Sequence, residues 1–311
     1  MNKTSTAPGG RSASRLRVAS GGAELQVYDY GNREAPPMVL VHGIQDFALS
    51  LEPIAEAFRD CYRVVSYDLR GHGDSDNSGI YSISHHLADL QAVLNALDLR
   101  RPTLVGHSLG GQIVCHYAGL FTEVPKCVVS IEGLGPPMRS REVPADQRRA
   151  RERRIVESLL RPTGEGRAIP TRQHALRQIR RNHPRLAPSQ AQRLVNLGTE
   201  PHSEGGLRWK WDTRVQTTWI SFSSLVTEER WGWIECPVLA VTAAEGAEFW
   251  SRRRAISAEE ARIDPQELER RLSLFRDCRH VEIAKAGHMV HYDQPVELVA
   301  AMADFLAQLA S

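Results

Sequence analysis

Long apolar runs are absent from this sequence of 311 residues. No uninterrupted stretch approaches the roughly 18 apolar residues that a membrane-spanning helix needs. The first 14 residues are small and polar, without the apolar segment of a secretory signal. We therefore expect residues 1–14 to form a disordered tail, and the protein to be cytoplasmic with no membrane span.

Cysteine is also scarce. The five cysteines are odd in number, widely spaced and mostly set within apolar runs, which favours reduced core thiols over a disulfide framework. No Cys or His spacing is typical of a metal site, and the sequence predicts neither a metal nor another cofactor.

Lysine is missing from residues 139–193, which contain fifteen arginines and five acidic residues. This stretch carries a charge of about +10, although the whole chain has a net charge of only +2. Two interpretations remain open: a solvated helical surface, or a lid that attracts an anionic substrate or an acidic surface. Because aromatic residues do not interleave with these arginines, we expect no nucleic-acid partner.

Eight short apolar runs have strand character, and from the third onward helix-like segments separate them. Several runs are continuous and β-branched, as in strands covered on both faces. This alternation predicts an α/β fold with a mostly parallel sheet flanked by helices, and the turn at Ser20-Gly21-Gly22 predicts an antiparallel start. The runs are residues 16–19, 25–30, 38–41, 63–67, 103–105, 127–131, 238–242 and 280–283.

The alternation stops between Gly133 and Trp233, where no convincing strand run occurs. Helix-favouring, charge-rich pieces fill this stretch, together with five of the six tryptophans. We interpret residues 134–234 as an inserted helical cap, and residues 15–133 and 235–311 as the core. The cap is expected above the carboxyl edge of the sheet, where open α/β sheets bind ligands.

The most informative motif is GHSLG at residues 106–110, placed between an apolar run and a helix-competent stretch. A turn this tight strains the central residue, and only glycines leave room around it. Such a strand–turn–helix presents the hydroxyl of Ser108 as a nucleophile. The backbone N–H of Leu109, at the helix start, is a candidate donor to an oxyanion.

A serine nucleophile also needs a base, an acid that orients the base, and a second oxyanion donor. His288 follows the last strand run on a loop with Gly287, and we favour it over His291, which leads into a helix. The turn at His42-Gly43 offers the backbone N–H of Ile44 as the second donor.

Taken together, these blocks resemble the α/β-hydrolase superfamily with a helical cap. The resemblance rests on residues 42–43, 68–75, 106–110 and 287–288, and with the strands between them it covers all but the tail and the cap. It implies an eight-stranded, mostly parallel sheet and a triad in the order Ser, acid, His. Within the block 68–75, Asp68 and Arg70 are expected to hold the turn together.

The acid departs from the pattern common among these relatives, because Gly246 stands where an aspartate is expected after the seventh strand. Two candidates remain open. Glu245 lies one residue earlier, and Glu132 ends the sixth strand, a position that some members of the superfamily use. Glu248 lies nearby, and either candidate can also be a polar strand-end residue.

A serine at the turn argues against epoxide hydrolases and haloalkane dehalogenases of this fold, which need a carboxylate there. We expect hydrolysis of a carboxylic ester, or a related acyl bond, of a small-molecule substrate that can be anionic. One alternative is carbon–carbon bond hydrolysis of a diketone acid, with the cap arginines holding a carboxylate. Another is a small-molecule receptor with slow turnover.

The tryptophans between residues 209 and 233 either line an acyl pocket or pack the cap against the core.

Overall fold

The computed structural model describes residues 12–309 apart from 137–143, 161–165, 221 and 255–256. Most of the expected tail therefore lies outside the described residues. Its last residue, Ser14, was expected to be disordered but begins the first strand, where it pairs with Asp29. Among the described helices, none has the length and apolar composition required to cross a membrane.

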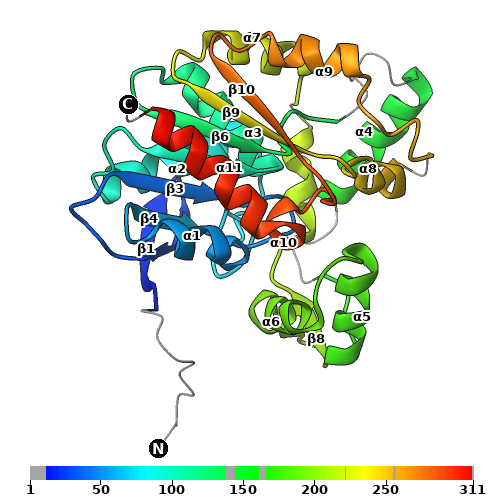
Figure 1. Ribbon diagram of the computed structural model, residues 1–311. Helices are drawn as coiled ribbons and strands as arrows, with labels where there is room; N and C mark the ends of the chain where they lie inside the picture. The colour runs from blue at the N-terminus through cyan, green and yellow to red at the C-terminus, as the bar shows by residue number, and fades with distance from the viewer. Residues whose placement is uncertain (1–11, 137–143, 161–165, 221, 255–256, 310–311) are drawn as a thin grey trace, which may run out of the picture.

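An eight-stranded sheet forms the centre of the molecule (Figure 1). Its order is β1-β2-β4-β3-β5-β6-β9-β10; the pairs β1–β2 and β2–β4 are antiparallel and all the others are parallel. The predicted α/β class and the antiparallel start are confirmed. The strands are β1 (Ser14–Ser20), β2 (Ala23–Asp29), β3 (Pro37–Val41), β4 (Arg63–Tyr67), β5 (Thr103–His107), β6 (Cys127–Ile131), β9 (Val238–Ala243) and β10 (Cys278–Ile283).

Helices cover both faces of the sheet, and every residue of β5, β6 and β9 is buried. This explains why their sequences are continuous apolar runs rather than alternating ones. One core packs the sheet against α2, α3, α7 and α9, and a second packs it against α1, α10 and α11. These helices are α1 (Glu52–Phe58, after the 3-10 turn η1 at Ala48–Leu51), α2 (Ile83–Ala96), α3 (Leu109–Leu120), α7 (Ser224–Trp233), α9 (Pro265–Leu272), α10 (Val290–Asp293) and α11 (Pro295–Gln308).

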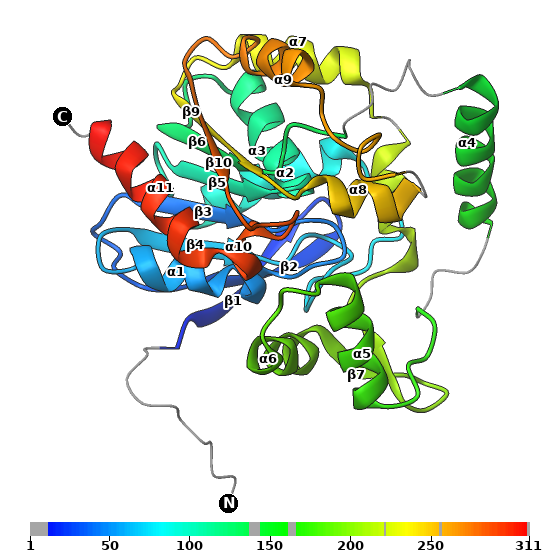
Figure 2. The same ribbon diagram turned by 45° about the vertical axis from the view of Figure 1, so that its right-hand side comes forward.

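Residues 134–234, which we call the insertion, join β6 to β9 and end in α7. A small apolar core of their own holds α5 and α6 together and packs on Phe47 and Tyr292. Figure 2 shows α4 standing beside the body of the molecule, away from α5 and α6. The other elements are α4 (Ala145–Leu159), α5 (Arg172–Asn182), α6 (Pro188–Gly198), β7 (Thr199–Pro201), β8 (Leu207–Trp209) and the 3-10 helix η3 (Thr213–Trp219).

The expectation that the insertion lacks strands is wrong, because β7 and β8 pair as an antiparallel ribbon. Each strand has only three residues, and all but Pro201, which is exposed, are partly buried. Such short, partly solvated strands leave neither an apolar run nor an alternating pattern in the sequence.

The turn after β4 is held as expected. The carboxylate of Asp68 accepts hydrogen bonds from the backbone N–H groups of Ala48 (2.7 Å) and Asp74 (2.9 Å). The guanidinium of Arg70 pairs with Asp89 in a buried ion pair. The turn therefore fixes the loop that follows β3, which borders the site described next.

Candidate active site

Ser108 sits between the last residue of β5 and the first residue of α3, with φ 53° and ψ −112°. These angles are strained for a residue with a side chain. A Cβ on Gly106 would lie 2.2 Å from the carbonyl oxygen of Gly110, and one on Gly110 would lie 2.1 Å from that of Val41. Only glycine fits at both positions, so that the sequence GHSLG is what permits this sharp turn.

His288 reaches Ser108 from the loop between β10 and α10. Its Nε2 lies 2.9 Å from the Ser108 Oγ, although 180 residues separate the two along the chain. The loop is fixed one residue earlier, where the backbone N–H of Gly287 donates to Asp293 (2.8 Å). His288 is buried, whereas Ser108 is partly exposed. The imidazole is therefore held on one side of a hydroxyl that solvent can reach.

Glu132, directly after β6, completes the chain of hydrogen bonds. Its Oε2 lies 2.9 Å from Nδ1 of His288, and its Oε1 accepts from the backbone N–H of Ala243 (2.7 Å). Its backbone is left-handed, with φ 51°, and its N–H donates to the carbonyl of Val241 (2.8 Å). One carboxylate oxygen thus accepts a hydrogen bond from the backbone of β9, and the other accepts one from His288.

The structure does not bring Glu245 to His288. The Glu245 carboxylate instead pairs with Arg185 of the insertion, which also binds Glu248 at 2.8 Å. The Glu245 side chain is 39% exposed, whereas that of Glu132 is 10% exposed. Of the two acids left open by the sequence, Glu132 alone has the hydrogen bond that orients a base.

Both candidate oxyanion donors lie beside Ser108. Leu109 follows it as the first residue of α3, so its N–H is one of those that an α-helix leaves without an internal partner. Ile44 follows Gly43, where an added Cβ would lie 3.2 Å from the Cβ of Ser108. The turn after β3 therefore passes directly alongside Ser108, and the role of Ile44 as a donor stays a prediction.

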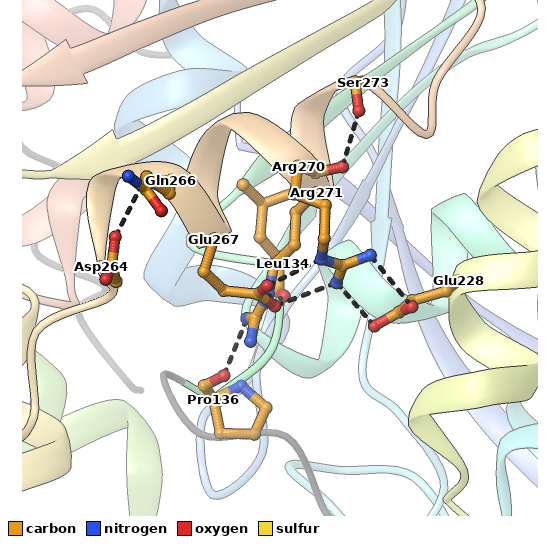
Figure 3. Close-up of polar contacts among 9 residues, drawn as sticks. All are labelled: Leu134, Pro136, Glu228, Asp264, Gln266, Glu267, Arg270, Arg271 and Ser273. Atoms are coloured by element: carbon orange, nitrogen blue, oxygen red, sulfur yellow. Dashed lines mark hydrogen bonds and ion pairs between the residues drawn. The ribbon is translucent and has the colours of Figure 1, made fainter.

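The segment after Glu132 is anchored to α9, as Figure 3 shows. The buried Arg271 donates to the carbonyls of Leu134 (3.0 Å) and Pro136 (2.7 Å), and its Nε pairs with Glu267 (2.8 Å). The first carbonyl lies only two residues beyond Glu132. This guanidinium thus fixes the chain where it leaves β6 and enters the insertion, next to Glu132.

A neighbouring arginine extends this network to the end of the insertion. Arg270 binds Glu267 within α9 and Glu228 of α7, with a closest contact of 2.9 Å to Glu228 (Figure 3). The start and the end of the insertion are therefore tied to the same short helix.

Two aromatic rings of α8 (Ala247–Arg254) lie against His288, and sequence reasoning missed both. Phe249 stacks on the imidazole, with ring centroids 4.1 Å apart and planes 15° apart, and Trp250 lies edge-on at 6.1 Å. The sequence signal was their position directly after the loop that carries Glu245. By contrast, Trp231 is buried against Phe275, which favours the packing interpretation for that tryptophan.

His291, the competing base, is fully buried beside Asp46, with its Nε2 3.6 Å from an Asp46 oxygen. Burial opposes ionisation of Asp46, yet the close approach of His291 holds the pKa of Asp46 below its usual value. Burial lowers the pKa of His107, whose Nε2 lies 2.8 Å from the carbonyl oxygen of His288. The His107 ring links these groups to His288, because its centroid lies 5.1 Å from that of His288 and 4.5 Å from that of His291.

Residues 38–302 match the sequence model described as the Alpha/beta hydrolase family. The chain belongs to this family. It is 32% identical to "Epoxide hydrolase 4" of Mus musculus over 112 residues, which are 35% of this chain and 31% of that protein. The chain thus spans about a third of the length of this curated relative.

Two solved structures resemble nearly the whole chain. One is a thioesterase domain from the curacin biosynthetic pathway, with a TM-score of 0.78 and 23% identity over 94% of this chain and 100% of that one. The other is E-2-(acetamidomethylene)succinate hydrolase, with a TM-score of 0.74 and 21% identity over 95% of this chain and 99% of that one. At such identities the likeness concerns the fold.

Proposed function

We propose that this α/β hydrolase cleaves a carboxylic ester, or a related acyl bond, of a small molecule through an acyl-enzyme on Ser108. The proposal rests on the continuous chain of hydrogen bonds from Ser108 through His288 to Glu132, with both distances to the histidine at 2.9 Å. A hydroxyl, a base and an orienting carboxylate in this order form the arrangement that activates serine nucleophiles.

In the first half of the reaction, Nε2 of His288 takes the hydroxyl proton as the Ser108 Oγ attacks the substrate carbonyl. Glu132 stabilises the imidazolium that forms and keeps Nδ1 protonated. The imidazolium then gives its proton to the departing alcohol as the bond between the acyl carbon and the alcohol oxygen breaks. In the second half, His288 takes a proton from water as the water oxygen attacks the acyl carbon. The imidazolium then returns this proton to the Ser108 Oγ as the acyl–Oγ bond breaks, which releases the acid and restores the hydroxyl.

The N–H groups of Leu109 and Ile44 would bind the negative oxygen of each tetrahedral intermediate. Loss of one such donor typically costs about 10²- to 10³-fold in kcat. Both belong to the backbone beside Ser108, in turns fixed by glycine packing and by Asp68. This packing supports the proposal that the two donors need no rearrangement when substrate binds.

The hydroxyl at residue 108 also separates this chain from the activity in the name of its mouse relative. Opening an epoxide through an alkyl-ester intermediate needs a carboxylate nucleophile, and neither oxygen of Glu132 is free for this role, because both accept hydrogen bonds. The partial match therefore does not carry epoxide hydrolysis to this protein.

The carbon–carbon alternative needs a cation to hold the substrate carboxylate. Arg185 of the insertion, which lies against Gly287 in the His288 loop, is already paired with Glu245 and Glu248. Arg193 is paired with Glu52 of the core. These two arginines are therefore already engaged within the protein, and an anionic substrate remains a prediction from the sequence alone.

Fluorophosphonate labelling followed by turnover of a short p-nitrophenyl ester tests the proposal and the receptor alternative together. We expect stoichiometric labelling of Ser108 in the full chain, sustained ester turnover, and loss of both in Ser108→Ala. Labelling without sustained turnover would favour a receptor. Unlabelled protein that folds normally would remove both functions.

A further inference from the structure

Beside Ser108 and His288, three buried side chains converge that the proposed reaction does not use. Single ligand atoms of Asp46, His107 and His291 all lie within 4.8 Å of one another, and all three residues are buried. They come from the loop after β3, the end of β5 and helix α10. Residues so far apart in the sequence leave no metal-binding spacing, which explains why none was predicted.

The tautomer of His107 follows from its surroundings. Its Nε2 lies 2.8 Å from the carbonyl oxygen of His288, which can only accept, so this nitrogen carries the hydrogen. The lone pair is therefore on Nδ1, which is buried and has no hydrogen-bond partner in the described part of the chain. Buried acceptors of this kind are rare in folded proteins unless a ligand or water satisfies them.

His291 also has buried ring nitrogens without a hydrogen bond to any residue that the structure describes. Neither of its ring nitrogens has a hydrogen-bond partner among the described residues, and its ring packs on His107 with centroids 4.5 Å apart. Its Nε2 lies 3.6 Å from an Asp46 oxygen. Two imidazoles with unsatisfied buried nitrogens thus flank one carboxylate.

The surroundings orient these groups as the partners of metal ligands do. The two Asp46 oxygens accept from the hydroxyls of Tyr292 (2.9 Å) and Ser50 (2.8 Å). The Nε2–H of His107 donates to the backbone carbonyl of His288. Histidine ligands almost always donate their other ring N–H to a carbonyl or carboxylate, and ligating carboxylates are themselves hydrogen-bonded.

We propose that Asp46, His107 and His291 bind a divalent first-row transition metal, with Zn²⁺ the best fit to two imidazoles and one carboxylate. This donor set suits zinc, whereas Mg²⁺ and Ca²⁺ prefer oxygen ligands. A tetrahedral zinc ion holds its ligand atoms about 3.3 Å apart. The three ligand atoms, which lie within 4.8 Å of one another, must therefore move closer together when the ion binds.

Such an ion would be structural. It would cross-link the end of β5 beside Ser108, the loop after β3 and helix α10, which follows His288, and thereby stabilise the segments that carry the hydrolytic groups. The inference is independent of the proposed ester hydrolysis, because its readout is metal uptake and stability.

The test uses the full chain with Cys61→Ser, which removes an exposed thiol that could take up metal elsewhere. Chelator-treated protein is titrated with Co²⁺ and Zn²⁺, with Mg²⁺ as a control. We expect one equivalent of Co²⁺ to give visible ligand-field bands. Zn²⁺ at about 100 times its Kd should raise the Tm by about 5–10 °C, and Mg²⁺ should not.

Asp46→Asn and His291→Gln should each weaken Zn²⁺ binding by more than about tenfold, because each removes a direct ligand, and loss of an outer-shell partner alone typically costs about 10- to 100-fold. His86→Gln, an equally buried histidine outside the cluster, should bind as the parent does. Crystals of the parent grown with Zn²⁺ should show an anomalous peak among the three side chains, even if a variant fails to fold. Absence of uptake by the parent, or a peak elsewhere, would overturn the proposal.

Discussion

The ends of β6 and β9 lie side by side in the sheet, and each is followed by a glutamate, yet the two glutamates have different partners. Glu132 directly follows β6 and is 10% exposed, with its oxygens divided between His288 and the backbone of β9. Glu245 comes two residues after β9, is 39% exposed, and pairs with Arg185. The difference shows that a carboxylate's role depends on which donors surround it.

The comparison also extends to how each end is anchored. The chain after Glu132 is held by Arg271, whose guanidinium is buried between two backbone carbonyls and Glu267. The chain around Glu245 is held by a half-exposed ion pair with the insertion. We therefore expect substitutions at the end of β6 to affect activity and stability far more than those at the end of β9.

The largest effect is expected for Glu132→Gln, which keeps the shape of the side chain and removes its charge. Ester kcat should fall by about 10³- to 10⁴-fold, because His288 loses both its orientation and the stabilisation of its charged form. Glu245→Gln is the matched control and should stay within about threefold of the parent. Steady-state kinetics check both, and the reverse ranking would assign the acid to Glu245.

Arg271→Met tests the anchoring of β6. Removing this buried guanidinium leaves Glu267 without one of its cationic partners and two carbonyls without a donor, so the free energy of unfolding should fall by about 3–5 kcal/mol. Arg270→Met, in the same helix but 33% exposed, should cost about 1 kcal/mol or less. Urea denaturation measures both. Equal losses would mean that burial does not distinguish the two arginines.

Arg185→Gln tests whether the ion pair at the end of β9 also supports the histidine loop. The Arg185 guanidinium lies against Gly287, because a Cβ on that glycine would come 3.0 Å from its Nη1. We expect kcat to fall about fivefold, equivalent to roughly 1 kcal/mol, with little change in KM.

Arg193→Gln is the control for Arg185→Gln. It removes another ion pair between the insertion and the core, that with Glu52, away from His288. Its kcat should match that of the parent. A similar loss in both variants would mean that docking of the insertion as a whole, rather than support of Gly287, sets the rate.

The smallest effect is expected for Phe249→Leu, on the helix that follows Glu245. Loss of a stacked ring worth about 0.5 kcal/mol should lower kcat/KM by about twofold to threefold. Trp250→Leu, whose ring lies farther from the imidazole, should change it less. A loss from Phe249→Leu as large as that from Glu132→Gln would show that α8, rather than β6, orients the base.

The sequence predicts the sheet and the Ser108 turn well, because continuous apolar strands and the glycines around Ser108 are local signals. It places His288 through the order of elements, since carboxyl ends of parallel strands share one edge. It leaves the acid undecided between Glu132 and Glu245, because the position of Arg185 depends on how the insertion folds back. The pairing of β7 with β8 and the Asp46, His107 and His291 cluster are likewise set by tertiary contacts.

The most direct test of the central claim is to trap the acyl group itself. Acid quenching during turnover of a p-nitrophenyl ester, followed by peptide mass spectrometry, should find the acyl group on Ser108 at up to one per chain. It should be absent in Ser108→Ala and strongly reduced in His288→Gln. Sustained turnover with the acyl group on another residue, or unchanged turnover by Ser108→Ala, would contradict the account.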